Sequence, residues 1–271
     1  MLRRKKAVAF FLGALIGFLC FVSISCSDKS VNAPTSIQRR FSNPYSYVSQ
    51  QHNEGLDYIL ERIKSNGLNI SGGITEGALM DKIQEYGAEF LLNKRTGGQS
   101  LHFFMQESKA TLQAKVFKTN SFLSDSLSDS QQKYVKEIYD LLDSVQDTTQ
   151  LAISLNDLEK QAYDDLGPEN SAVVLAAGSV AYSSTVYWMN NFSQWEEALT
   201  GSSGLNKSGE ADRVTNLLAI GKADVAGAVG GAIGSVTTGC AELSLGECAG
   251  AGALGGGLGA SDAECILELL R

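Results

Sequence analysis

Apolar residues recur every three or four positions through most of the chain, and this spacing predicts helices. The first clear case runs from Asn53 to Ser65, where the apolar positions make one face of an amphipathic helix. They are Leu56, Ile59, Leu60 and Ile63. The glycines from Gly67 to Gly73 interrupt the pattern.

A second helix is expected after Thr75, whose hydroxyl can cap it. Its apolar stripe consists of Leu79, Ile83, Tyr86 and Phe90. A break is expected from Lys94 to Gln99, around a pair of glycines, followed by a less regular helix from Phe103 to Leu123.

The middle of the chain carries start and stop signals as well as periodicity. Ser128 lies three residues before Gln131, the spacing of a capping box. The stripe that follows consists of Tyr134, Ile138, Leu141, Leu142 and Val145.

The next helix is expected to start near Ser154, to carry Leu155, Leu158 and Ala162 inward, and to end at Gly167-Pro168. An Ala/Ser/Val-rich helix is expected from Ser171 to Asn191. No regular series of alternating strands is readable, so the predicted fold is an all-α helical bundle.

The C-terminal region is rich in glycine, because 13 of the 28 glycines lie between Gly221 and Arg271. Small residues recur every four positions in two low-charge runs, Val225–Ala241 and Cys248–Ser261. This places them in one row on a helix, where backbones can approach closely. The pattern resembles a glycine zipper and predicts a helical hairpin with its turn at Thr237–Glu247. Such a hairpin can be buried in the body, drive self-association at a membrane, or insert as a pore element.

The N-terminus carries a basic segment, Arg3 to Lys6, then an apolar run from Ala7 to Ile24 that is closed by Ser25-Cys26. These are the parts of a secretory signal. With a cysteine after the small residue, the segment resembles the signal and lipobox of bacterial lipoproteins, although Ser23 stands where that family usually has an aliphatic residue.

The resemblance implies that residues 1–25 are removed and that Cys26 receives diacylglyceryl and acyl (palmitate-type) groups. Cys20 is a poorer candidate because bulky residues precede it. The alternative is an uncleaved transmembrane anchor, since the apolar run is about long enough to span a bilayer. Ser27 after the cysteine implies sorting to the outer membrane.

The chain is accordingly divided into three parts. Residues 26–47 form a lipidated tether, and residues 48–271 form one helical domain that includes the Gly/Ala-rich hairpin at 221–271. The net charge of −8 argues against nucleic-acid partners and against binding to anionic lipid. The bilayer is therefore expected to be reached through the acylated N-terminus alone.

Three cysteines remain after Cys26. Cys240 and Cys248 flank the expected turn and are the favoured disulfide pair, with Cys248–Cys265 as the alternative. No metal site or cofactor is expected, because the chain has only 2 His and no CxxC pattern.

His52, Asn53 and Trp188 are the candidate polar or ligand site. Asn53 is expected to cap the first helix, and Trp188 lies in an aromatic group with Tyr187 and Trp195 that is more often core than a ligand platform. No catalytic residue is assigned and no enzyme is expected. A tight polar cluster around His52 would favour one.

Three short motifs, together with the signal, resemble uncharacterised helical lipoproteins of Gram-negative bacteria. They are His52-Asn53, the Ser184–Trp188 stretch and the Ala-Asp-x-x-Gly sequence of the tail. The expected function is a membrane-anchored structural or interaction module of the cell envelope, with a protein partner or self-association. The alternative is an antagonistic, pore-forming protein that uses the Gly-rich hairpin.

Overall fold

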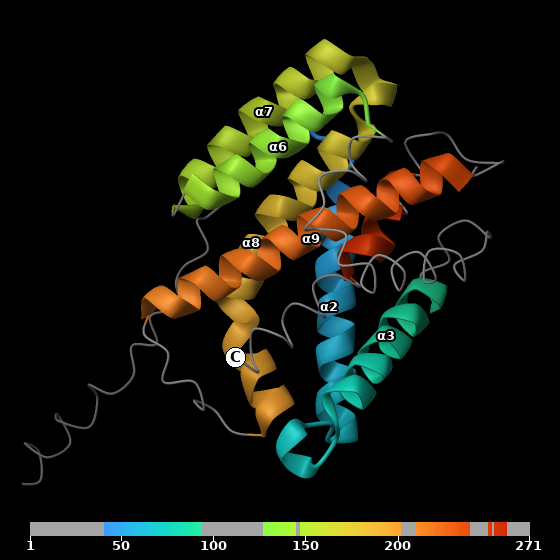
Figure 1. Cartoon of the computed structure of the whole chain (residues 1–271), viewed down its shortest axis with the longest axis vertical. Coiled ribbons are helices and arrows are strands. Elements are labelled where there is room, and N and C mark those ends of the chain that lie inside the picture. The colour runs from blue at the N-terminus through green and yellow to red at the C-terminus, as the bar shows by residue number, and fades with distance from the viewer. Residues whose placement is uncertain are drawn as a thin grey trace, which may run out of the picture. The chain divides into compact units, whose positions relative to one another are not determined.

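The computed structural model describes residues 41–93, 127–144, 147–201, 210–238, 249–250 and 252–258, and no strand occurs among them (Figure 1). The helices are α2 (Ser46–Asn66), the 3-10 turn η1 (Ile70–Gly72), α3 (Glu76–Asn93), α6 (Asp129–Ser144), α7 (Thr148–Asn170), α8 (Ala172–Thr200) and α9 (Glu210–Thr238). Residues 249–250 and 252–258 are also helical. The predicted all-α bundle is confirmed.

Helix α2 begins at Ser46, earlier than the predicted start at Asn53. The expected cap at Asn53 is therefore wrong, because this residue lies within the helix. The buried positions of its first two turns are Val48, Ser49 and His52, of which only one is apolar. Hydrophobic periodicity could therefore not predict that the helix includes these first two turns. The helix ends at Gly67, whose φ of 60° suits glycine.

Helix α3 packs against α2 with the stripe read from the sequence. The four residues of that stripe, Leu79, Ile83, Tyr86 and Phe90, are all buried. The backbone N–H of Ala78 donates to Thr75 Oγ1 at 3.3 Å, which confirms the predicted cap.

The capping box of α6 is present as predicted. The backbone N–H of Gln131 donates to Ser128 Oγ at 3.3 Å, and that of Ser128 donates to Gln131 Oε1 at 2.9 Å. The buried side chains of α6 are Tyr134, Val135, Ile138 and Leu142.

Helix α7 begins at Thr148 rather than near Ser154. Asp147 caps it by accepting from the backbone N–H groups of Thr149 and Gln150, at 2.6 and 3.3 Å. The predicted start was wrong because the polar residues 147–150 look like a loop until the cap is recognised. The predicted break at Gly167 is confirmed, since its φ of 76° and ψ of 169° are not helical.

Helix α8 continues to Thr200, beyond the predicted end at Asn191. The two asparagines at 190 and 191 suggest a loop, but the inward stripe continues through Phe192, Trp195 and Leu199, which are buried. The helix stops before Gly201, whose φ is 73°.

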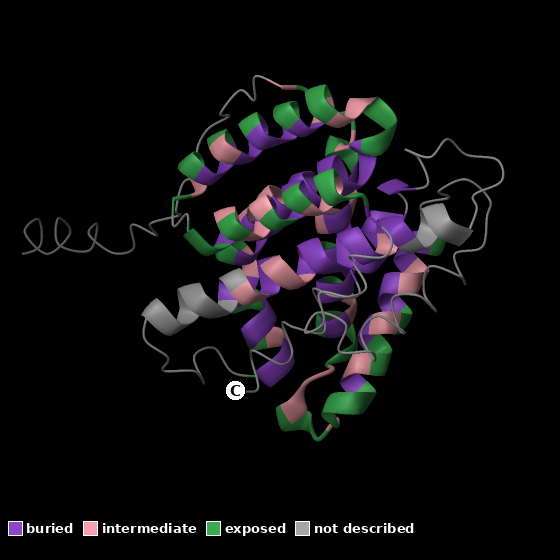
Figure 2. Ribbon diagram, turned by 45° about the horizontal axis from the view of Figure 1, so that its top comes forward, coloured by how far each residue is buried: buried purple, intermediate pink, exposed green. Residues whose placement is uncertain are grey.

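Helix α8 is the central element, since α2, α7 and α9 all pack against it. Burial extends around much of the circumference of α8, whereas α6 and α7 each turn an exposed face outward (Figure 2). Among the described helices, α8 is long and apolar enough to cross a membrane, but 78% of its apolar window is buried within the body.

The described Gly-rich residues are packed inside the body. Gly227 and Gly231 of α9 meet Gly252 and Gly256 so closely that an added Cβ at Gly231 or Gly256 would lie well under 3.0 Å from backbone atoms of the opposite segment. The contact uses steps of four residues on both sides, as expected for rows of small residues on helices.

Several predicted features lie outside the described residues. They are the signal segment, Cys20 and Cys26, the tether up to residue 40, Lys94–Gln99, Phe103–Leu123, Val145, residues 239–247 of the predicted hairpin turn, and Cys240, Cys248 and Cys265.

Candidate functional site

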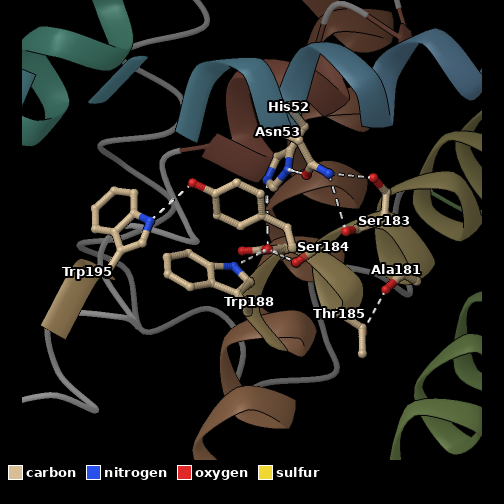
Figure 3. Close-up of polar contacts among 10 residues, drawn as sticks. His52, Asn53, Ala181, Ser183, Ser184, Thr185, Trp188 and Trp195 are labelled. Atoms are coloured by element: carbon tan, nitrogen blue, oxygen red, sulfur yellow. Dashed lines mark hydrogen bonds and ion pairs between the residues drawn. The ribbon is translucent and has the colours of Figure 1, made fainter. Parts of the chain in front are cut away.

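A group of buried and partly buried polar side chains, which we call the polar cluster, joins three helices that are far apart in the sequence (Figure 3). Helix α2 contributes His52 and Asn53, α8 contributes Ser183, Ser184 and Trp188, and α9 contributes Asp224. Positions 184 and 188 are four residues apart, so both side chains lie on the same face of α8.

Asp224 is the centre of the polar cluster. Its Oδ2 atom accepts hydrogen bonds from the Ser184 hydroxyl and from Trp188 Nε1, the latter at 3.1 Å. His52 Nε2 lies 3.7 Å from the same oxygen. All four side chains have a relative exposure of 0%. A carboxyl oxygen has two lone pairs and can accept both of these hydrogen bonds.

The hydrogen bonds of Asn53 show which nitrogen of the His52 imidazole carries a hydrogen. Its Nδ2 donates to the backbone carbonyl of Ser183 at 3.3 Å and to the Ser183 hydroxyl at 2.7 Å. A carbonyl can only accept, so the Asn53 Oδ1 atom must face His52 Nδ1, from which it lies 3.1 Å away. The hydrogen-bond network thus places a proton on Nδ1.

The other ring nitrogen of His52 then faces a carboxylate. A neutral ring with its proton on Nδ1 would direct the Nε2 lone pair at Asp224 Oδ2, which is unfavourable. A ring protonated on both nitrogens makes an attractive pair instead. The His52 ring and the Asp224 carboxyl group thus face each other away from water.

A glycine-rich backbone covers the imidazole. A Cβ added at Gly257 would lie 3.1 Å from His52 Cδ2 and 3.5 Å from Nε2, so a larger residue would press on the ring. Glycine at this position lets the chain pass directly over His52.

An aromatic group extends the polar cluster into the apolar core. The Trp188 ring lies 5.2 Å from that of Trp195 and 5.4 Å, edge-on, from that of Tyr187. Trp195 Nε1 donates to the Tyr187 hydroxyl at 3.1 Å. Because all three side chains are buried, these rings pack the interior and do not form an exposed ligand platform.

The order of the groups differs from that of a nucleophilic triad. In a triad the imidazole lies between serine and carboxylate and takes the serine proton. Here Asp224 lies between Ser184 and His52, and the Ser184 hydroxyl donates to the carboxylate. The tight polar cluster around His52 that was expected to favour an enzyme is thus present. Its His52, Ser184 and Asp224 side chains are fully buried, however, so the arrangement is suited to holding α2, α8 and α9 together.

The structure brings together all three residues of the candidate polar site, His52, Asn53 and Trp188. The sequence analysis did not select Ser184 and Asp224 as site residues, although each lies in one of the three short motifs. Asp224 had a readable signal, because it is an acidic residue at the border of a long low-charge, Gly-rich run.

Within the described ranges, no group of three or more His, Cys, Asp or Glu is placed to hold a metal ion. Comparison with known proteins gives no match: no family model fits the chain, and no curated protein or solved structure is significantly similar to it.

Proposed function

We propose that this protein is a lipoprotein of the bacterial outer membrane, anchored through Cys26, whose helical body is a structural or interaction module. The observation that carries the proposal is the position of the polar cluster. Its His, Ser and Asp side chains are buried and join helices to one another. Because these side chains serve the packing of helices, we place the role of the body at its surface.

The attachment of the N-terminal segment to the body supports an anchoring role. Asn156 of α7 accepts from the backbone N–H of Phe41 at 3.2 Å and donates to the carbonyl of the same residue at 3.0 Å. The Phe41 ring packs against Tyr163, and Asn43 Nδ2 donates to the Leu175 carbonyl at 2.8 Å. The chain that comes from Cys26 thus enters the body at a fixed point.

The length of chain before this point limits how far the body can stand from the membrane. The residues between Cys26 and Phe41 span at most about 50 Å when fully extended. A module held within that distance of a bilayer suits partners in or near the same membrane.

The test of the anchor is the intact mass of the protein from the membrane fraction. We expect a chain that starts at Cys26 and carries acyl groups, and we expect Cys26→Ala to abolish both the processing and the added mass. Cys20→Ala is the matched control and should leave the mass of the mature protein unchanged. A wild-type chain that is uncleaved and unmodified would contradict the proposal.

The module role is tested by chemical cross-linking in intact membranes. A discrete conjugate with a second protein, or with a second copy, is expected for wild type and should weaken when Cys26→Ala releases the chain from the membrane. Wild-type protein that gives no discrete conjugate would contradict an interaction role.

A second candidate is a membrane-active, antagonistic protein. The observation in its favour is that α8 is long and apolar enough to span a bilayer and packs against the Gly-rich α9. Leakage of a dye from liposomes on addition of the protein would favour this candidate, and binding without leakage would favour the interaction module.

A further inference from the structure

We infer that the polar cluster is a latch, and that it holds a C-terminal unit which can open while α6 and α7 remain folded. The C-terminal unit is defined as α9 together with residues 249–250 and 252–258. The inference concerns the body alone and does not depend on lipidation.

The C-terminal unit has little intrinsic helical stability. Each glycine inside a helix costs about 1 kcal/mol relative to alanine. Glycines occur throughout the helical stretch from Val225 to Ile233 and again in residues 252–258. Such segments are helical because they are packed, so separation from their neighbours and loss of helix should occur together.

The neighbours of residues 249–250 and 252–258 include one face of α2. Added Cβ atoms at Gly250 and Gly257 would meet the side chains of Tyr47 and His52, respectively. Leu258 lies over Gly55, where an added Cβ would be 2.7 Å from the leucine side chain. The segment therefore follows α2 for about two turns, and His52 lies within that contact.

The latch connects both parts of the C-terminal unit to the same imidazole. Asp224 of α9 faces His52 Nε2, and Gly257 covers the ring. Ser184 and Trp188 of α8 hold the Asp224 carboxylate from the other side. Loss of the His52–Asp224 pair should therefore destabilise the contacts of α9 and those of residues 252–258 together.

The other described ion pair of α9 is more exposed to solvent than the His52–Asp224 pair. Lys222 pairs with Asp143 of α6, but the two side chains are 32% and 60% exposed. Solvent and salt screen exposed pairs, whereas a buried charge that loses its partner is strongly unfavourable. Among the described ionic contacts of α9, the latch should therefore stabilise the C-terminal unit most, in addition to buried apolar side chains such as Val225 and Val229.

Helices α6 and α7 are expected to stay folded because apolar contacts hold them to each other and to α8. Their buried side chains include Ile138 and Leu142 of α6 and Leu151 and Leu155 of α7, and none of these belongs to the polar cluster. Parts of a protein with separate contacts commonly open as separate units.

Hydrogen exchange of the full mature chain in detergent micelles tests the inference. Asp224→Asn keeps the shape of the side chain and removes its charge. We expect amide exchange in the C-terminal unit to become about 100-fold faster or more, while exchange in α6 and α7 is unchanged. His52→Gln should accelerate amide exchange in the same regions.

The matched control is Leu142→Ala, which opens a cavity in α6 away from the latch. It should accelerate exchange in α6 and α7. In the double variant His52→Gln/Asp224→Asn, the stability lost by the C-terminal unit should be smaller than the sum of the losses in the two single variants. The reason is that neither charge is then left unpaired.

Two results would overturn the inference: equal acceleration of all described helices by Asp224→Asn, or no change in the C-terminal unit. If Asp224→Asn does not fold, wild-type exchange at rising, sub-denaturing urea concentrations decides. Exchange in the C-terminal unit should then depend less on urea than exchange in α6 and α7, because its opening exposes less surface. The same urea dependence in both regions would contradict the latch.

Discussion

The α6–α7 pair and the C-terminal unit are both helical, but they are held in place by different physical means. The α6–α7 pair has caps at Ser128 and Asp147, outward lysine–carboxylate pairs such as Lys133–Glu137, and a row of large apolar side chains inside. The C-terminal unit also buries apolar side chains such as Val229 and Leu258, but it adds close contacts between glycine backbones and a buried carboxylate, Asp224, in the polar cluster.

This difference shows how much a helix can depend on its surroundings. Caps and amphipathic stripes act within a few residues of chain, so the helices of the α6–α7 pair are favoured by their own local sequence. Rows of glycine do not favour a helix locally, and they stabilise one only when a second backbone packs against them. Substitutions in the two regions should therefore differ in how much stability they remove.

The largest effect is expected from Asp224→Ala. It leaves His52 buried without its charge partner and removes the acceptor of Ser184 and Trp188. The free energy of unfolding should fall by about 3–5 kcal/mol, measured by urea denaturation of the full mature chain. The control is Asp140→Ala, which removes an exposed partner of Lys136 and should cost less than about 0.5 kcal/mol. Similar losses in both variants would show that the polar cluster does not support the C-terminal unit.

A slightly smaller loss is expected from Gly256→Ala. The added methyl group would meet the backbone of Gly227 well under 3.0 Å, so the two segments must move apart. We expect a loss of about 3 kcal/mol, the upper end for overpacking.

Gly87→Ala in α3 is the matched control, because its added methyl group would lie at an ordinary 3.7 Å from Ile59 Cδ1. This change should stabilise the chain by up to about 1 kcal/mol through higher helix propensity. A stabilising Gly256→Ala variant would mean that the close backbone contact is not required.

The local caps of the α6–α7 pair should contribute less. Asp147→Ala removes the side chain that accepts from two backbone N–H groups at the start of α7. We expect a loss of about 1 kcal/mol in thermal or urea unfolding. Asp147→Asn keeps the acceptor and should recover most of the loss. If the asparagine variant is as unstable as the alanine variant, the hydrogen bonds are not the source of the effect.

The smallest effect appears only in alkaline solution. Burial, with a further contribution from the hydrogen bond to Asp165, raises the pKa of Tyr134 to about 12. In the unfolded chain this phenol loses its proton near its ordinary pKa of about 10. Its contribution is therefore fully present below pH 10 and is lost as the pH rises toward about 12.

The measurement is the difference in unfolding free energy between wild type and Tyr134→Phe as a function of pH. That difference should be constant below pH 10 and should shift against wild type above it. A difference that stays flat through this range would show that Tyr134 ionises alike in the folded and unfolded chains.

Much of the fold was predictable from local patterns. The stripe of α3, the capping box at Ser128 and the break at Gly167 all depend on residues close together in the sequence, and each was found where the pattern placed it. The errors fell where local signals were weak. The first turns of α2 bury Ser49 and His52, and α7 starts at a cap, Asp147, that lies within a polar stretch.

The candidate site was predictable only in part. His52, Asn53 and Trp188 stood out as unusual residues, but nothing in their spacing could show that they meet. Ser184 and Asp224 became site residues only when α8 and α9 were placed beside α2. A polar side chain gives no periodic signal, and its partner depends on which helices are neighbours.

The helical class, the course of most helices and the rows of small residues near the C-terminus could all be read from the amino-acid sequence. These properties follow from hydrophobic period, caps and composition, which act over a few turns. The packing of the described Gly-rich residues inside the body, and the buried His52–Asp224 pair that joins them to α2 and α8, became visible in the three-dimensional structure. The physical reason is that close backbone packing and buried charge pairing exist only between segments that the fold has already brought into contact.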